Sequence, residues 1–138
     1  MSAQKVIICK DLKAELSEFL ESVKYDKLFV LTDTNTLELC FPLLKGVPQL
    51  QDAPVITVDA GDTNKNIEQV SSIWMRLCNE GASRNSLLLN VGGGMITDMG
   101  GFVAATFKRG IYSVNIPTTL MASVDAAVGG KTGINFNG

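Results

Sequence analysis

The 138-residue chain contains no histidine, only three cysteines and no long apolar run. Without histidine, a zinc site built on imidazole ligands is excluded within these residues. Cys9, Cys40 and Cys78 lie far apart in the sequence. This pattern fits neither a zinc motif nor a disulfide framework, and it suits a reducing cytosol.

Signals for secretion and for membrane insertion are also missing. The amino terminus, MSAQKVIICKD, has four consecutive apolar residues before charge returns, whereas a membrane helix needs about 20. Twelve basic and fourteen acidic side chains give a net charge of −2, which argues against nucleic acid or an anionic membrane as partner. We therefore expect a cytoplasmic protein that binds neither.

Short apolar segments alternate with helical patterns along the chain. Five segments rich in strand-forming residues cover 5–9, 27–33, 54–59, 86–91 and 111–116. Apolar residues at helical spacing predict helices over 11–23, 66–80 and, more weakly, 97–108, and Gly81 is placed to end the second. This alternation predicts one α/β domain with a Rossmann-like parallel sheet and helices on both faces.

In such folds, ligands bind beyond the carboxyl ends of the strands. The predicted strands lead into Asp33, DAGDTNK, VGGGMITD and NIPTTL. Glycines, hydroxyls and carboxylates should therefore gather along one edge of the sheet. That edge is the predicted binding site.

The segment GGGMITD, which begins at Gly92, is the strongest ligand signal in the chain. Bare glycine backbone at the start of a helix lets a pyrophosphate approach peptide N–H groups. The fingerprint G-x-G-x-x-G is not met, because Thr97 holds the place of the third glycine and no acid stands about 20 residues further on. Packing alone is the alternative reason for these glycines, and we favour ligand binding.

The segment DAAVGGKT ends like a phosphate-binding P-loop, but Asp125 stands where its first glycine is required. Lys131 among glycines still suits a phosphate. Thr118 can serve as a helix cap, a ligand contact or both, and Asp33 can be a turn residue closing its strand. By default, Lys108 and Arg109 complement a helix dipole.

Taken together, LTDTN, GGGMITDMGGFVAATFKRG and NIPTTLMASVDAAVGGKTGIN resemble the 3-dehydroquinate synthase family of sugar-phosphate cyclases. The resemblance runs from about residue 27 to the end and is specific over 92–135. It implies that residues 1–138 form an NAD-binding domain. In the family, a larger helical domain follows and supplies a Glu/His/His site for zinc or cobalt, which would account for the missing histidine.

The resemblance also implies the reaction. The family converts 3-deoxy-D-arabino-heptulosonate 7-phosphate to 3-dehydroquinate and phosphate in the shikimate pathway, toward chorismate and the aromatic amino acids. NAD transiently oxidises the C5 hydroxyl, phosphate leaves, and the hydride returns before an aldol step closes the carbocycle. A small sugar phosphate is thus the expected substrate, and residues 1–138 alone are expected to be inactive.

Site residues follow from the resemblance, position by position. Cofactor contacts fall on Asp33, Asn35, Asp62, Lys65, Gly93, Gly94, Met95, Thr97, Asp98, Thr118, Thr119 and Lys131. Catalytic roles fall on Asp125 and Lys131 beside the nicotinamide. A further catalytic role falls on Arg109, which would reach the phosphate of a substrate held by the other subunit of a homodimer.

Two positions depart from the family pattern: Asp62 stands where most relatives have Glu, and Thr97 where Gly is common. Three alternatives remain open at this point. They are another cyclase such as 2-deoxy-scyllo-inosose synthase, a metal-dependent glycerol or alcohol dehydrogenase, and a dinucleotide-binding module acting alone.

Overall fold

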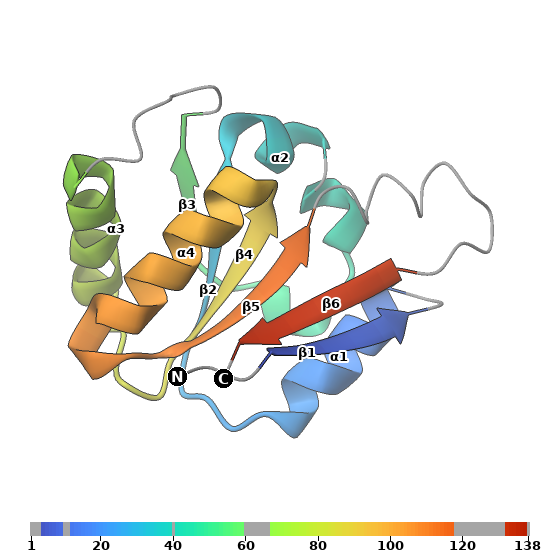
Figure 1. Ribbon diagram of the computed structural model, residues 1–138. Coiled ribbons are helices and arrows are strands. Elements are labelled where there is room, and N and C mark those ends of the chain that lie inside the picture. The colour runs from blue at the N-terminus through green and yellow to red at the C-terminus, as the bar shows by residue number, and fades with distance from the viewer. Residues whose placement is uncertain (1–3, 10–11, 40, 60–66, 118–131, 138) are drawn as a thin grey trace.

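The computed structural model describes residues 4–9, 12–39, 41–59, 67–117 and 132–137. Within these residues, one six-stranded sheet has the order β1-β6-β5-β4-β2-β3 (Figure 1). Its strands are β1 (Gln4–Cys9), β2 (Leu28–Asp33), β3 (Val55–Val58), β4 (Leu87–Gly92), β5 (Tyr112–Pro117) and β6 (Thr132–Asn137).

Helices lie on both faces of this sheet, which confirms the predicted α/β architecture. One face carries α1 (Leu12–Ser22) and the 3-10 helices η1 (Phe41–Leu44) and η2 (Pro48–Leu50). The other carries α3 (Ile67–Asn79) and α4 (Gly94–Thr106), which lies across β4 and β5 in Figure 1. The remaining elements are α2 (Thr34–Leu39), directly after β2, and the 3-10 helix η3 (Phe107–Arg109), directly after α4.

The core is divided by the sheet into two apolar layers. In β4, Leu87 and Leu89 pack on the α1 side, whereas Leu88 packs on the α3 and α4 side. All six residues of β4 are buried. A central strand covered on both faces reads as a continuous apolar run, which is why the sequence marks β4 so clearly.

Four strands, β5-β4-β2-β3, pair in parallel, as predicted. The sequence did not predict β6, which lies between β1 and β5 and is antiparallel to both. Its sequence, TGINFN, lacks the continuous apolar run that identified the other strands. A mixed sheet with one antiparallel strand is a common variant of this architecture.

The predicted helices are present, with one shifted start and one addition. Gly81 ends α3 as expected: it has a φ of +83°, its N–H donates to the Cys78 carbonyl, and the Ala82 N–H donates to that of Leu77. These two bonds form a Schellman motif. The start of α4 lies three residues before the predicted one, because its glycines enter the helix. The short α2 was not predicted.

Candidate functional site

The chain order of the strands places a topological switch point between β2 and β4. These two strands are parallel neighbours, with Thr32 opposite Val91. From β2 the chain continues to β3 on one side, and from β4 it continues to β5 on the other. Because the connections after β2 and β4 run to opposite sides, a crevice forms beyond the ends of these two strands. Ligands bind in such crevices in open α/β sheets. Asp33 and Gly92 end the two strands and flank this point.

The three glycines after β4 have different structural roles. A Cβ on Gly92 would lie 2.6 Å from the Cβ of Ile96, so this glycine lets α4 pack onto the strand. Gly93 is the N-cap of α4 and has extended backbone. A Cβ on Gly94 would meet nothing within 4 Å. Packing therefore explains Gly92, whereas the space beside Gly94 is open.

The N-terminus of α4 lies beside this open space. The Thr97 N–H makes a helical bond to the Gly93 carbonyl at 3.0 Å. The N–H groups of Gly94, Met95 and Ile96 precede that bond and have no carbonyl one turn back in the helix. Such donors, together with the helix dipole, form a binding site for an anion such as a phosphate group.

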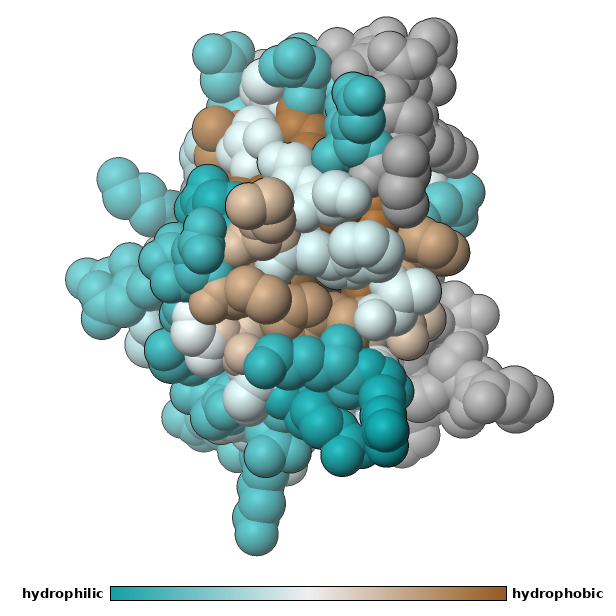
Figure 2. Space-filling model, turned by 90° about the vertical axis from the view of Figure 1, so that its left-hand side faces the viewer, coloured by the Kyte–Doolittle hydropathy of each residue, from teal (hydrophilic) through white to brown (hydrophobic). Residues whose placement is uncertain are grey.

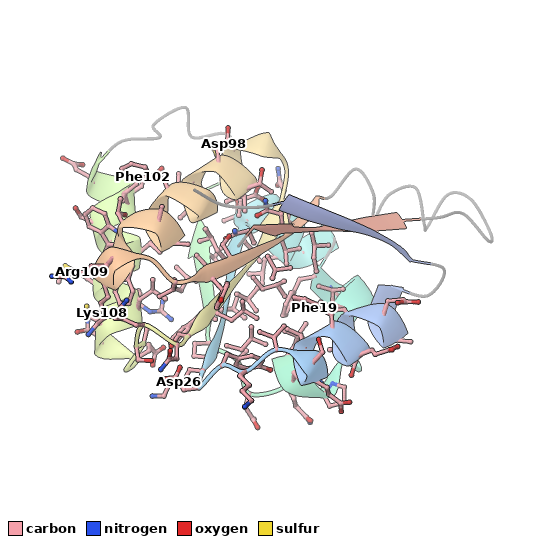
Figure 3. All side chains as sticks on the ribbon, turned by 60° about the horizontal axis from the view of Figure 1, so that its bottom comes forward. Phe19, Asp26, Asp98, Phe102, Lys108 and Arg109 are labelled. Carbon is pink, nitrogen blue, oxygen red and sulfur yellow. The ribbon has the colours of Figure 1, made fainter. Side chains whose placement is uncertain are left out.

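The other predicted residues of α4 differ in exposure. The Thr97 hydroxyl donates to the Gly94 carbonyl at 3.2 Å, so this side chain is used within the first turn. Met95 is half-buried against the core, and Asp98 is exposed. In Figure 3, Asp98 lies at the same end of α4 as the glycines.

Asp33 caps α2. Its Oδ1 accepts a hydrogen bond from the Thr36 N–H at 2.7 Å, and the Thr36 hydroxyl oxygen accepts one from the Asp33 N–H at 2.9 Å. This reciprocal pair is a capping box, and it confirms the turn-forming role that the sequence had left open. The capped carboxylate still borders the switch point, and Asn35 is exposed one residue into α2.

Arg109 does not belong to this group. It follows α4 at the end opposite the glycines, as Figure 3 shows, and a 13-residue helix is roughly 20 Å long. Lys108 and Arg109 have φ values of 44° and 70°, in the left-handed region that non-glycine residues seldom adopt. Both side chains are exposed.

The structure describes eight of the predicted site residues, and seven of these lie around the switch point. Asp33 and Asn35 border the switch point on the β2 side; Gly93, Gly94, Met95, Thr97 and Asp98 border it on the β4 side; and Arg109 lies apart. Asp62, Lys65, Thr118, Thr119, Asp125 and Lys131 lie outside the described residues.

Sequence reasoning missed a buried polar cluster just below the strand ends. Asn90 of β4 is fully buried, and its Nδ2 donates to the Ser113 hydroxyl at 2.8 Å and to Asn115 Oδ1 at 2.9 Å. Both partners belong to β5. The available signal was an asparagine within each of two apolar strands, at positions that pair in register.

Metal ligands do not gather in the part of the chain that the structure covers. There, no three His, Cys, Asp or Glu side chains come close enough to hold an ion. The helices of the same residues include none that is long and apolar enough to span a membrane.

Comparisons with known proteins identify the family to which this chain belongs. The family described as 3-dehydroquinate synthase N-terminal matches residues 55–138, which is more than half of the chain. The 3-dehydroquinate synthase of Parabacteroides distasonis is 70% identical over all 138 residues. The chain spans 39% of the length of that relative.

Solved structures with the same fold include two of 2-deoxy-scyllo-inosose synthase. One has a TM-score of 0.68 at 20% identity and covers 96% of this chain and 42% of its own. The other is a complex with carbaglucose-6-phosphate, NAD+ and Co2+ and has a TM-score of 0.64 at 23% identity. Its match covers 91% of this chain and 38% of the synthase chain. At these identities the likeness establishes the fold.

Proposed function

Because the chain belongs to the 3-dehydroquinate synthase N-terminal family, we propose that it forms the NAD-binding part of a 3-dehydroquinate synthase. The complete enzyme is a lyase that converts 3-deoxy-D-arabino-heptulosonate 7-phosphate to 3-dehydroquinate and phosphate in the shikimate pathway. The 70% identity to a 3-dehydroquinate synthase supports this activity over that of other cyclases and of dehydrogenases.

One observation carries the cofactor assignment: the N-terminus of α4 opens onto the switch point between β2 and β4. The Gly93 cap and the open space at Gly94 leave the first N–H groups of the helix accessible. The two phosphates of NAD match these donors in charge and hydrogen bonding. When bound, NAD would supply a reversible hydride acceptor.

The remaining cofactor contacts are distributed around that point. Asp33 and Asn35 would bind the adenosine and ribose side, since an acid at the end of a neighbouring strand commonly accepts from ribose hydroxyls. Met95, Thr97 and Asp98 would line the path toward the nicotinamide. From the family resemblance, Asp62, Lys65, Thr118, Thr119 and Lys131 complete the cofactor set.

The rest of the active site would lie beyond these residues. Zinc or cobalt would be bound by a part of the enzyme outside this chain, and Asp125 and Lys131 would face the sugar phosphate. The 2-deoxy-scyllo-inosose synthase complex with NAD+, Co2+ and carbaglucose-6-phosphate supports this arrangement by its shared fold. The enzyme would act in the cytoplasm, where the exposed free Cys78 would stay reduced.

Arg109 would complete the active site of a second subunit. It lies at the far end of α4, roughly 20 Å from the helix start, and its side chain is exposed. Apolar surface lies nearby: Phe102 of α4 is 51% exposed and Met75 of α3 is 63% exposed. Figure 2, which views the α3 side, shows hydrophobic residues in a band across that surface. These features support a homodimer.

The experiment is a comparison of two glycines in the full-length protein. Gly94 and Gly101 both lie in α4, and a Cβ at either would meet nothing within 4 Å. We expect Gly94→Val to abolish most NAD binding in calorimetry, because the valine side chain blocks approach to the helix start, whereas Gly101→Val binds normally. Equal binding by both variants would contradict the assignment.

Activity is tested separately by phosphate release from the heptulosonate phosphate with NAD and zinc present. The full-length protein should release phosphate, and residues 1–138 alone should not. If the full-length protein binds NAD but releases no phosphate, the proposed cofactor site stands and the proposed synthase activity is contradicted.

A further inference from the structure

The Asn90 cluster connects the two strands that lead into the proposed cofactor site. Asn90 lies opposite Asn115 in the register of β4 and β5, and two residues further on Gly92 lies opposite Pro117. The residues Asn90, Ser113 and Asn115 are 0%, 4% and 7% exposed. Buried polar groups cost stability unless they are paired, and here the Asn90 Nδ2 group is paired with two side chains of β5.

The Asn90 amide also contacts the helix above it. A Cβ on Gly100 would lie 1.9 Å from Asn90 Oδ1, 2.2 Å from its Cγ and 2.6 Å from its Nδ2. The amide therefore occupies the space that a side chain at Gly100 would need. Among the described residues, Oδ1 has no hydrogen-bond partner. It faces the bare backbone of α4 instead, where a weak contact with a Cα–H is available.

Two contacts set the distance of α4 from β4. Ile96 lies over Gly92, and one turn later Gly100 lies over Asn90. On the strand, Gly92 and Asn90 are alternate residues and face the same side of the sheet. In each pair, a side chain from one element fills the space left by a glycine of the other. These two contacts together fix the position of α4 on β4.

We propose that Asn90 is a positioning residue for NAD binding: it holds α4 at the depth that places the helix N-terminus at the cofactor phosphates. This inference rests on the proposed function. Hydrogen bonds weaken outside a narrow range of distance and angle. A displacement of α4 at Gly100, less than two turns from the start of the helix, would misplace the N–H groups of Gly94 and Met95.

The hydrogen bonds of Asn90 hold the amide in this place. Its two donors are directed to Ser113 and Asn115 on β5, which fixes the side chain in the plane between the strands and the helix. Removing the amide should leave α4 less firmly positioned on β4, and adding a methyl group at Gly100 should push the helix away from the sheet.

The test measures NAD affinity by calorimetry and thermal stability in four full-length variants. Gly100→Ala should weaken NAD binding roughly tenfold, which corresponds to the loss of about one hydrogen bond to a charged group. Gly101→Ala, its neighbour with open space, should bind as the wild type does. Asn90→Ala should weaken binding several-fold.

The double variant Asn90→Ala/Gly100→Ala separates position from stability. The alanine methyl group then takes the space that the amide leaves, so NAD affinity should return to within about threefold of the wild type. The bonds to Ser113 and Asn115 stay lost, so the melting temperature should stay low.

The outcomes are distinct. Folded Gly100→Ala or Asn90→Ala protein with wild-type NAD affinity would overturn the positioning role, even if its melting temperature falls. Should Gly100→Ala not fold, Asn90→Ala and the double variant decide by the same comparison. A wild-type protein that binds no NAD would overturn the proposed function as well.

Discussion

Gly92 at the end of β4 lies directly beneath Ile96 of α4, and a Cβ on this glycine would lie 2.6 Å from the Ile96 Cβ. We expect Gly92→Ala to lower the free energy of unfolding by about 1–3 kcal/mol, because the added methyl group forces strand and helix apart. Urea unfolding of the full-length protein measures this.

Gly94→Ala is the matched control, because its methyl group would enter open space. It should change the free energy of unfolding by less than about 1 kcal/mol. If both variants lose equal stability, the two glycines do not have the separate roles assigned to them.

Asp33 is expected to combine a cap with a cofactor contact, and two substitutions separate these roles. Asparagine caps helices as well as aspartate does, so Asp33→Asn should change stability by less than about 0.5 kcal/mol. Without its charge, the residue should bind NAD several-fold more weakly. Calorimetry on the full-length variant checks this.

Thr36→Val removes the partner in the capping box while keeping the shape of the side chain. It should lower the free energy of unfolding by about 1 kcal/mol. Wild-type NAD affinity in Asp33→Asn would restrict Asp33 to the capping of α2.

Asp26 connects the start of β2 to the loop before β4 through hydrogen bonds. It should make the free energy of unfolding depend on pH in the acidic range. Its carboxylate accepts hydrogen bonds from the Ser83 hydroxyl and from the Ser86 hydroxyl, the latter at 2.7 Å. The bond from Ser83, followed by that from Ser86, lowers the pKa of Asp26 below its usual 3.8.

Because the folded pKa is the lower one, the stabilisation is fully present above the unfolded pKa and is lost as pH falls through the folded value. The difference in unfolding free energy between wild type and Asp26→Asn should therefore be constant near neutrality and shrink below about pH 4. Asp52→Asn, at an exposed aspartate outside this cluster, is the control. A difference that is independent of pH would contradict the role of the ionised carboxylate.

Lys131 is expected to act mainly on turnover. A cation near developing negative charge stabilises the transition state more than the bound cofactor, so Lys131→Ala should lower kcat far more than it weakens NAD binding. Steady-state kinetics and calorimetry on the full-length variant distinguish the two. Normal turnover with poor cofactor affinity would assign Lys131 to the NAD phosphates.

Arg109 is expected to act in the partner's active site. Arg109→Ala and Lys131→Ala homodimers should each be nearly inactive. In a mixed dimer, however, one site combines an intact Lys131 with an intact Arg109 from its neighbour. Unfolding and refolding the two variants together should restore activity toward half the wild-type value for each mixed dimer.

Lys108→Ala is the control, since Lys108 shares the exposure and the left-handed backbone of Arg109. It should remain active as a homodimer. If mixed dimers form and no activity returns, Arg109 serves its own subunit.

The sequence alone predicted five of the six strands that the structure describes, the helices α1, α3 and α4, and one edge of the candidate site. Strands such as β4 are buried on both faces, so a continuous apolar run marks them. Gly81 marks the end of α3 because its backbone needs a positive φ. The glycines after β4 likewise indicated a ligand at a helix start. Each of these patterns involves residues close together in the chain, so it can be recognised from one sequence without knowledge of tertiary contacts.

Tertiary structure decided what depends on contacts between distant residues. Only the pairing of β6 between β1 and β5 showed that the sheet is mixed. Only the packing of α4 on β4 showed that Gly92 and Gly100 are needed for packing while Gly94 stands beside open space. Asn90 and Asn115 are 25 residues apart and hydrogen-bond across two strands. No periodicity within either strand encodes that pairing, because strand order and register arise from the whole chain.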